Sequence, residues 1–68
     1  MKISARNILK GMVVEVVKGA TTAHVKLDVK GTIVTASITN EAVDELKLVA
    51  GMQAYAVIKA SDIMVAID

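Results

Sequence analysis

Two short segments near opposite ends of the chain contain the residue types best suited to capture a small oxyanion. Lys2-Ile3-Ser4-Ala5-Arg6-Asn7 lies near the first residue, and Lys59-Ala60-Ser61 lies near the last. Each joins a cationic side chain to a hydroxyl and to closely spaced backbone amides, which are the groups that hold such an anion. Each charge-assisted hydrogen bond to a doubly charged anion contributes roughly 1.5–3 kcal/mol. The pattern predicts binding and not catalysis.

A third cluster of donors is predicted at Thr39 and Asn40. A hydroxyl or amide residue there precedes acidic residues and then an apolar pattern of near-helical spacing, which is typical of a helix start. Free backbone amides and the helix dipole both favour negative charge at such a position.

The residues needed for catalysis or for metal ligation do not stand out. An enzyme needs a nucleophile with its base, or two carboxylates whose environments separate their pKa values. Asp44 and Glu45 fit the solvated face of the predicted helix, and His24 lies on the polar side of an alternating strand. Cysteine is absent, and one histidine cannot build a structural metal site. We expect a protein that is not an enzyme and that ligates no metal directly.

The elements that must position these segments are mostly strands. Residues 23–29 alternate strictly between apolar and polar, and residues 32–38 resume the same period with Val34, Ala36 and Ile38 pointing inward. Lys30-Gly31 is a tight turn between the two segments, so a hairpin is predicted. An earlier strand covers residues 12–17 and begins near Ile8, with a bulge or bend at Gly11. Helix 40–48 follows the hairpin, and strands 53–58 and 63–67 complete the chain.

This order places a helix between the third and fourth of five strands, which is the layout of the OB-fold. We therefore expect a mainly β protein, with residues 1–68 forming one domain that folds as a five-stranded, partly open Greek-key barrel. The continuous apolar pairs Val13-Val14 and Val16-Val17 indicate a strand covered on both faces. One face would meet the core and the other a partner chain.

Size and composition favour self-association. A chain of 68 residues buries only roughly 60% of the surface that its unfolded form exposes, yet 54% of the residues are hydrophobic. Small domains commonly gain stability from disulfides, metals or association. Because the first two are excluded here, we expect a homo-oligomer.

Charge and aromatic content limit the possible partners. Net charge is +1, with the signs well mixed, and Tyr55 is the one aromatic residue, so neither a polyanion-binding field nor base-stacking platforms are expected. No apolar run approaches the roughly 20 residues of a membrane span, and no secretion signal is evident. We expect a cytoplasmic protein that binds neither membrane nor nucleic acid.

Five strings that include the anion-binding candidates carry a family resemblance. They are Met1-Lys2-Ile3-Ser4-Ala5-Arg6-Asn7, Val16-Val17-Lys18-Gly19, Ala36-Ser37-Ile38-Thr39, Leu48-Val49-Ala50-Gly51 and Val57-Ile58-Lys59-Ala60-Ser61. On these residues, and over essentially its whole length, the chain resembles the molbindins, or Mop domains, which are small molybdate-binding proteins of bacteria.

The resemblance implies an OB-like barrel that assembles as a homohexamer and holds tetrahedral oxyanions between subunits. One subunit would contribute Ser4, Ala5, Arg6, Lys59 and Ser61. Its neighbour would contribute Thr39 and the backbone near Ala42, where some relatives have serine and this chain offers only a main-chain donor. Lys18, Gly19 and Thr22 are candidates for a second type of oxyanion site.

The function that the resemblance implies is binding of molybdate, and of the similarly sized tungstate, for intracellular storage or homeostasis. No catalytic cofactor is expected. Two other classes stay open on the sequence: a protein-interaction module that uses the apolar surface, and an OB-type nucleic-acid binder.

Overall fold

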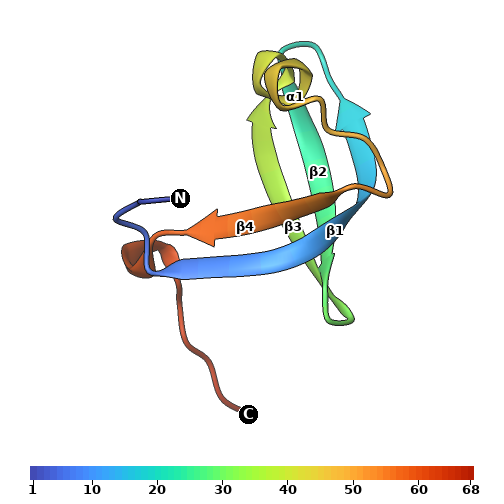
Figure 1. Ribbon diagram of the computed structural model, residues 1–68. Coiled ribbons are helices and arrows are strands. Elements are labelled where there is room, and N and C mark those ends of the chain that lie inside the picture. The colour runs from blue at the N-terminus through green and yellow to red at the C-terminus, as the bar shows by residue number, and fades with distance from the viewer.

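The computed structural model describes all 68 residues, which form a strongly curved antiparallel sheet with one short helix at one end (Figure 1). The sheet has the strand order β3-β2-β1-β4. Its elements are β1 (Asn7–Lys18), β2 (Thr22–Val29), β3 (Thr32–Thr39), helix α1 (Asn40–Leu46), β4 (Gln53–Ile58) and a 3₁₀ turn, η1 (Ala60–Asp62). The mainly β class, the four strands from 7 to 58 and the helix after the third strand confirm the sequence prediction.

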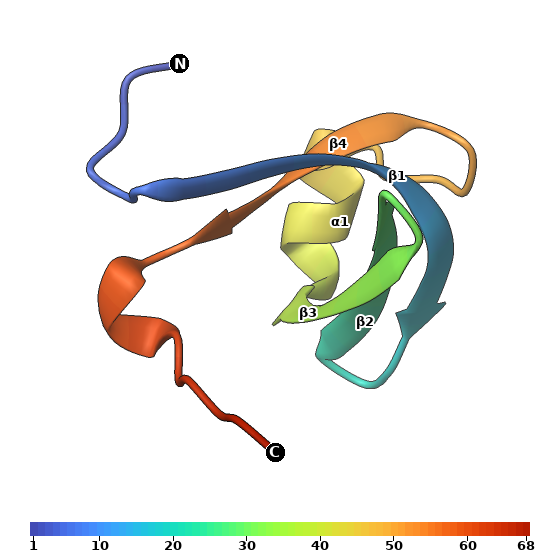
Figure 2. The ribbon, with the colours of Figure 1, turned by 90° about the horizontal axis from the view of Figure 1, so that it is seen from below.

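Strand β1 joins the two halves of the sheet. Its first half pairs with β4 from Asn7 to Met12, and its second half pairs with β2 from Met12 to Lys18. A bulge between Val13 and Glu15 bends the strand where it changes partner, and Figure 2 shows β1 and β4 crossing over the β2–β3 hairpin. The bulge therefore lies after Gly11 and not at it.

Gly11 is needed for close packing of two backbones. A Cβ atom at this position would lie 2.7 Å from the carbonyl oxygen of Asp28 on β2 and 3.0 Å from Val29 Cγ2. Only glycine lets β1 approach β2 this closely before the bulge.

The β2–β3 hairpin turns at Lys30 and Gly31, as predicted. Both residues have positive φ, 50° and 89°, which is the requirement of the tight hairpin turn that matches the twist of its strands. The Asp28 carboxylate accepts a hydrogen bond from the Gly31 N–H at 2.7 Å and so fixes the turn.

The core is small and consists of aliphatic side chains. Its buried residues are Val13, Ala23, Val25, Leu27 and Val43. The apolar face of residues 23–29 is the inward one, since Ala23, Val25 and Leu27 are buried and Val29 is half-buried. Only 6 of the 68 residues are buried in the single chain, so most of its apolar surface is uncovered.

Helix α1 is two residues shorter than predicted, because Lys47 adopts the left-handed conformation at φ 54°. The Lys47 and Leu48 amides donate to the Asp44 and Val43 carbonyls and end the helix in a Schellman motif. At the other end the Thr39 hydroxyl caps the helix. Val43 is the helix residue that packs into the core.

The prediction of a fifth strand at residues 63–67 is wrong for the single chain, and with it the five-stranded barrel. After η1 the chain leads away from the sheet (Figures 1 and 2) and forms no strand. Met64, Val65 and Ile67 are each at least 90% exposed. The apolar run Ile63 to Ile67 marks a segment that can be a strand, but strand formation also needs a sheet edge within reach, and this segment pairs with none. The sheet stays open, and its edges are β3 and β4.

Candidate functional site

The two candidate anion-binding segments lie at the same end of the β1–β4 ribbon. Asn7 is paired with Ile58, and the Asn7 side-chain amide donates to the Ile58 carbonyl at 3.2 Å. Because the strands are antiparallel, Arg6, just before β1, and Lys59, just after β4, lie at the same end of the pair. Pairing of β1 with β4 thus brings together two cations that lie far apart in the sequence.

The loop before β1 is organised by Arg6. Its guanidinium Nε donates to the Ser4 carbonyl at 2.9 Å, and Nη2 donates to the Ile3 carbonyl at 3.4 Å. Both contacts lie at the surface. Two N–H groups of Arg6 are therefore engaged, and three of the five that a guanidinium carries remain free.

The segment after β4 turns into η1. Lys59 precedes the turn, Ser61 lies inside it, and the Asp62 amide donates to the Lys59 carbonyl at 3.0 Å. Lys59 and Ser61 are exposed. The Lys59 ammonium forms no ion pair within the chain, so its charge is available.

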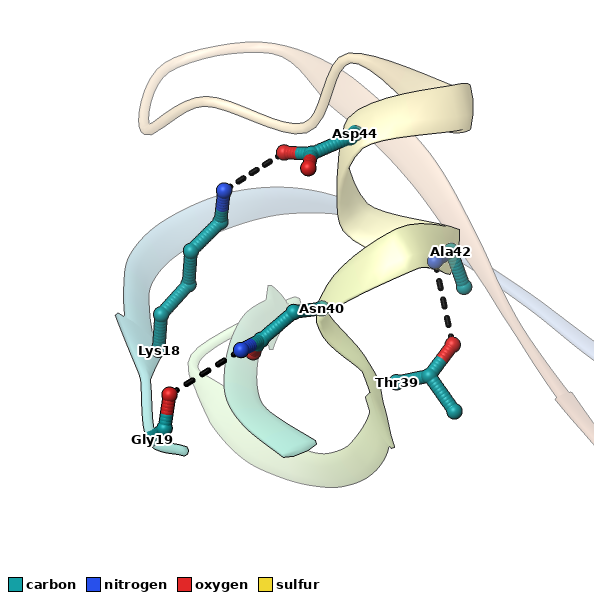
Figure 3. A network of polar contacts seen from close by, with 6 residues as sticks. All are labelled: Lys18, Gly19, Thr39, Asn40, Ala42 and Asp44. Carbon is teal, nitrogen blue, oxygen red and sulfur yellow. Dashed lines mark hydrogen bonds and ion pairs between the residues drawn. The ribbon is translucent and has the colours of Figure 1, made fainter. Parts of the chain in front are cut away.

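Thr39 and Ala42 lie at the other end of the molecule, where α1 begins. The Ala42 N–H donates to Thr39 Oγ1 at 3.0 Å (Figure 3). One of the two donors predicted here is therefore already used inside the chain. The hydroxyl hydrogen of Thr39 is free to point outward, because Oγ1 acts as the acceptor in this contact.

Lys18, Gly19 and Thr22 lie beside Thr39 and not beside Arg6. Thr22 is paired with Thr39 across the β2–β3 ladder, and the Gly19 N–H donates to the Thr22 carbonyl at 2.7 Å. The Lys18 ammonium lies 2.5 Å from Asp44 Oδ1 on the helix, and both side chains are about half exposed or more. In the single chain this lysine has a partner.

Asn40, predicted with Thr39 as part of a donor cluster at the helix start, has a structural role that the sequence did not indicate. Its side-chain amide donates to the Gly19 carbonyl at 3.0 Å (Figure 3). Its backbone amide donates to the Thr21 carbonyl at 2.9 Å. Asn40 Oδ1 is buried and has no partner. The sequence signal was the Thr-Asn pair at the helix start, which allows either residue to cap the helix and leaves the other free to bond elsewhere.

A single chain keeps the two groups of candidates apart. Figure 1 shows the end that carries the N-terminal loop and η1 on one side of the sheet, and α1 on the other. The full 12-residue length of β1 runs between them. No group of three or more histidine, cysteine or acidic side chains is arranged to hold a metal ion. None of the helices is long and apolar enough to cross a membrane.

Comparison with known proteins places this geometry in a family. The TOBE domain model matches residues 3–65. A probable molybdenum-pterin-binding protein of Haemophilus influenzae is 45% identical over 69 residues, which cover 100% of both chains.

Two solved structures are similar in both sequence and fold. A molybdate-binding protein from Sporomusa ovata has a TM-score of 0.93 and 44% identity, with 97% of this chain and 98% of that chain covered. The cytoplasmic molybdate-binding protein ModG, solved with molybdate bound, has a TM-score of 0.84 and 49% identity, with 88% of this chain and 43% of that chain covered.

Proposed function

The chain belongs to the TOBE domain family, as a molbindin, and from this premise we propose that it binds free molybdate between copies of itself and stores it in the cytoplasm. Molbindins are binding proteins for molybdate or molybdenum-pterin and are not enzymes. The observation that carries the proposal is the pairing of Asn7 with Ile58, which places the Ser4-Ala5-Arg6 loop and Lys59 at the same end of the β1–β4 ribbon.

The candidate residues support a site shared by two subunits. A tetrahedral dianion needs donors from several directions, and the loop at Ser4, Ala5 and Arg6 with Lys59 and Ser61 approaches from one side only. Thr39 and the backbone near Ala42 lie at the opposite end of the same chain, so a neighbouring copy must bring them. Lys18, Gly19 and Thr22 lie next to Thr39 and would form the second type of site.

The proposed site offers hydrogen-bond donors and no acceptors, and this accounts for the proposed selectivity for molybdate over phosphate. Hydrogenphosphate carries a proton that needs an acceptor, whereas molybdate and tungstate accept hydrogen bonds only. Asp62 is the nearest carboxylate along the chain, and it pairs with neither Lys59 nor Arg6. Sulfate has the same charge as molybdate and would be rejected by the larger size of the cavity.

Inorganic molybdate fits the chain better than a molybdenum-pterin. A pterin is planar and is held best by aromatic faces, as other flat heterocycles are. Tyr55 is the one aromatic residue, and it lies on β4 opposite Lys10, in the middle of the ribbon and not at the end that carries Arg6 and Lys59.

The open sheet supports assembly of a homo-oligomer, which we propose to be a hexamer. The edges β3 and β4 flank an apolar groove of about 750 Å³, lined by 17 residues of which 15 are hydrophobic. An edge strand beside such a groove is a template for an added strand. Residues 63–67 of a second copy have the length and apolar character to close the sheet into a five-stranded barrel.

Burial of this segment would contribute substantially to assembly. Each large aliphatic side chain contributes roughly 1.5–3 kcal/mol when it moves from water to an apolar site. Met64, Val65 and Ile67 are almost fully exposed in the single chain. Since molybdate would bind between subunits, it should in turn stabilise the oligomer by mass action.

Native mass spectrometry with molybdate, with sulfate and with no added anion tests the proposal. We expect a hexamer that gains discrete molybdate masses and gains none with sulfate. A hexamer that takes up no molybdate would show that molybdate is not the ligand. A monomer that binds molybdate would show that the site is not shared between subunits.

A further inference from the structure

We propose that Arg6 is a positioning residue whose side chain aims the backbone amides of Ser4 and Ala5 at the bound oxyanion. The inference rests on the proposed function, because it concerns the same site. It differs in assigning the direct contact to the main chain of the loop and not to the charged end of the arginine.

The first step is the clamp that Arg6 forms on its own loop. Its guanidinium holds the carbonyls of Ile3 and Ser4, which are consecutive along the chain, at 3.4 Å and 2.9 Å. Both carbonyls therefore point toward the same planar group. A guanidinium can form this contact because its N–H groups are fixed in one plane.

The second step follows from peptide geometry. All peptide bonds of the chain are trans, and in a trans peptide the C=O and the following N–H point in opposite directions. The carbonyl of Ile3 belongs to the same peptide plane as the Ser4 amide, and the carbonyl of Ser4 to that of the Ala5 amide. Both amides must therefore point away from the guanidinium, on a common side of the loop.

The third step is that these two donors are free. Neither the Ser4 N–H nor the Ala5 N–H donates to any acceptor within the chain. Ser4 is exposed and Ala5 is half-buried. Successive backbone N–H groups that point to one side form a concave site for anions. Arg6 thus keeps the carbonyls of the loop away from a ligand that they would repel.

Molybdate titration of variants separates positioning from charge. Arg6→Lys keeps the positive charge but cannot clamp two carbonyls, so we expect binding about 100-fold weaker, as in Arg6→Ala, from loss of two aligned donors. Lys10→Ala is the matched control, since it removes an exposed charge from β1 and should bind as the unaltered protein does. If Arg6→Lys binds normally while Arg6→Ala does not, the arginine acts through its charge and the proposal fails.

Amide resonances provide a second, direct readout. Adding molybdate should shift the Ser4 and Ala5 amide protons more than the Arg6 Nε proton. A shift at Arg6 Nε with none at Ser4 and Ala5 would overturn the proposal while leaving molybdate binding intact. If the unaltered protein binds no molybdate, the proposed function fails. The clamp is then tested by hydrogen exchange at Arg6 Nε, which its hydrogen bond to the Ser4 carbonyl should slow relative to a free arginine side chain; unprotected exchange would overturn the clamp.

Discussion

The side-chain amide of Asn40 donates to the carbonyl of Gly19 at 3.0 Å and so ties the first residue of the helix to the turn between β1 and β2 (Figure 3). The backbone amide of Asn40 holds Thr21 in the same turn. Thr39, immediately before Asn40, is thereby fixed relative to Gly19 and Thr22. The candidate donors at the helix start and those at the turn between β1 and β2 are therefore held in a fixed position relative to each other.

We expect Asn40→Ala to destabilise the protein by about 1 kcal/mol, because loss of this hydrogen bond outweighs the gain from removing a buried oxygen without a partner. Asn40→Asp should be less stable than Asn40→Ala at pH 7, since a carboxylate beside the Gly19 carbonyl has no hydrogen to donate. Folding then raises the pKa of the introduced carboxyl, so its deficit relative to Asn40→Ala should shrink as pH falls toward about 4. Urea unfolding at several pH values measures this, and a deficit that grows on acidification would contradict it.

Thr39 has two functions that different substitutions separate. Thr39→Val removes the cap of Ala42, at a cost of about 1 kcal/mol, and removes the hydroxyl hydrogen that faces outward. We expect both stability and molybdate affinity to fall. Thr39→Ser keeps the oxygen and its hydrogen, and should retain both. Calorimetric titration beside thermal unfolding checks this; equal affinity in Thr39→Val would remove Thr39 from the site.

Lys59→Ala should weaken molybdate binding and leave folding almost unchanged. The ammonium is exposed and makes no ion pair in the chain, so no internal contact is lost. Loss of one charge-assisted hydrogen bond corresponds to roughly 10-fold to 100-fold in affinity. Lys26→Ala, on the outer face of β2, provides a control of equal charge. Equal weakening in both variants would indicate a general charge effect and not a contact.

The apolar tail gives a test of assembly. Val65→Asp places a charge on a segment that we propose to be buried in a second copy, so the native mass should shift from the hexamer toward smaller species. Val49→Asp is the control, because Val49 is also exposed, at 61%, but does not line the apolar groove. An intact hexamer in Val65→Asp would show that the tail lies outside the interface.

Local patterns in the sequence predicted each strand that pairs within one chain. The alternation of β2 and β3 and the Lys30-Gly31 turn are short-range signals, and they describe contacts between neighbours in the sequence. The apolar run at residues 63–67 also predicted a strand, which the single chain does not form. Sequence reveals that a segment can pair but not which chain supplies its partner.

For the candidate site too, the sequence did not reveal which distant segments pair. Pairing of Asn7 with Ile58 was not predictable from the sequence, and it places Arg6 and Lys59 at the same end of the β1–β4 ribbon. The internal contacts were also missed: Lys18 with Asp44, Asn40 with Gly19, and the clamp of Arg6. These contacts depend on side-chain directions that only the folded backbone fixes, and no periodic pattern records them.

Gly11→Ala should destabilise the protein more than Gly31→Ala. At Gly11 the new methyl group would meet the Asp28 carbonyl oxygen at 2.7 Å, so β1 and β2 would have to separate, at a cost of about 1–3 kcal/mol. At Gly31 nothing lies within 4 Å, and the cost, about 1 kcal/mol, comes only from its φ of +89°. Urea unfolding at one fixed protein concentration compares the two, since assembly makes stability depend on concentration. Equal stability of the two variants would mean that the β1–β2 approach is looser than this packing requires.

Gly11 also precedes the bend that orients the β1–β4 ribbon, so Gly11→Ala should weaken molybdate binding while Gly31→Ala does not.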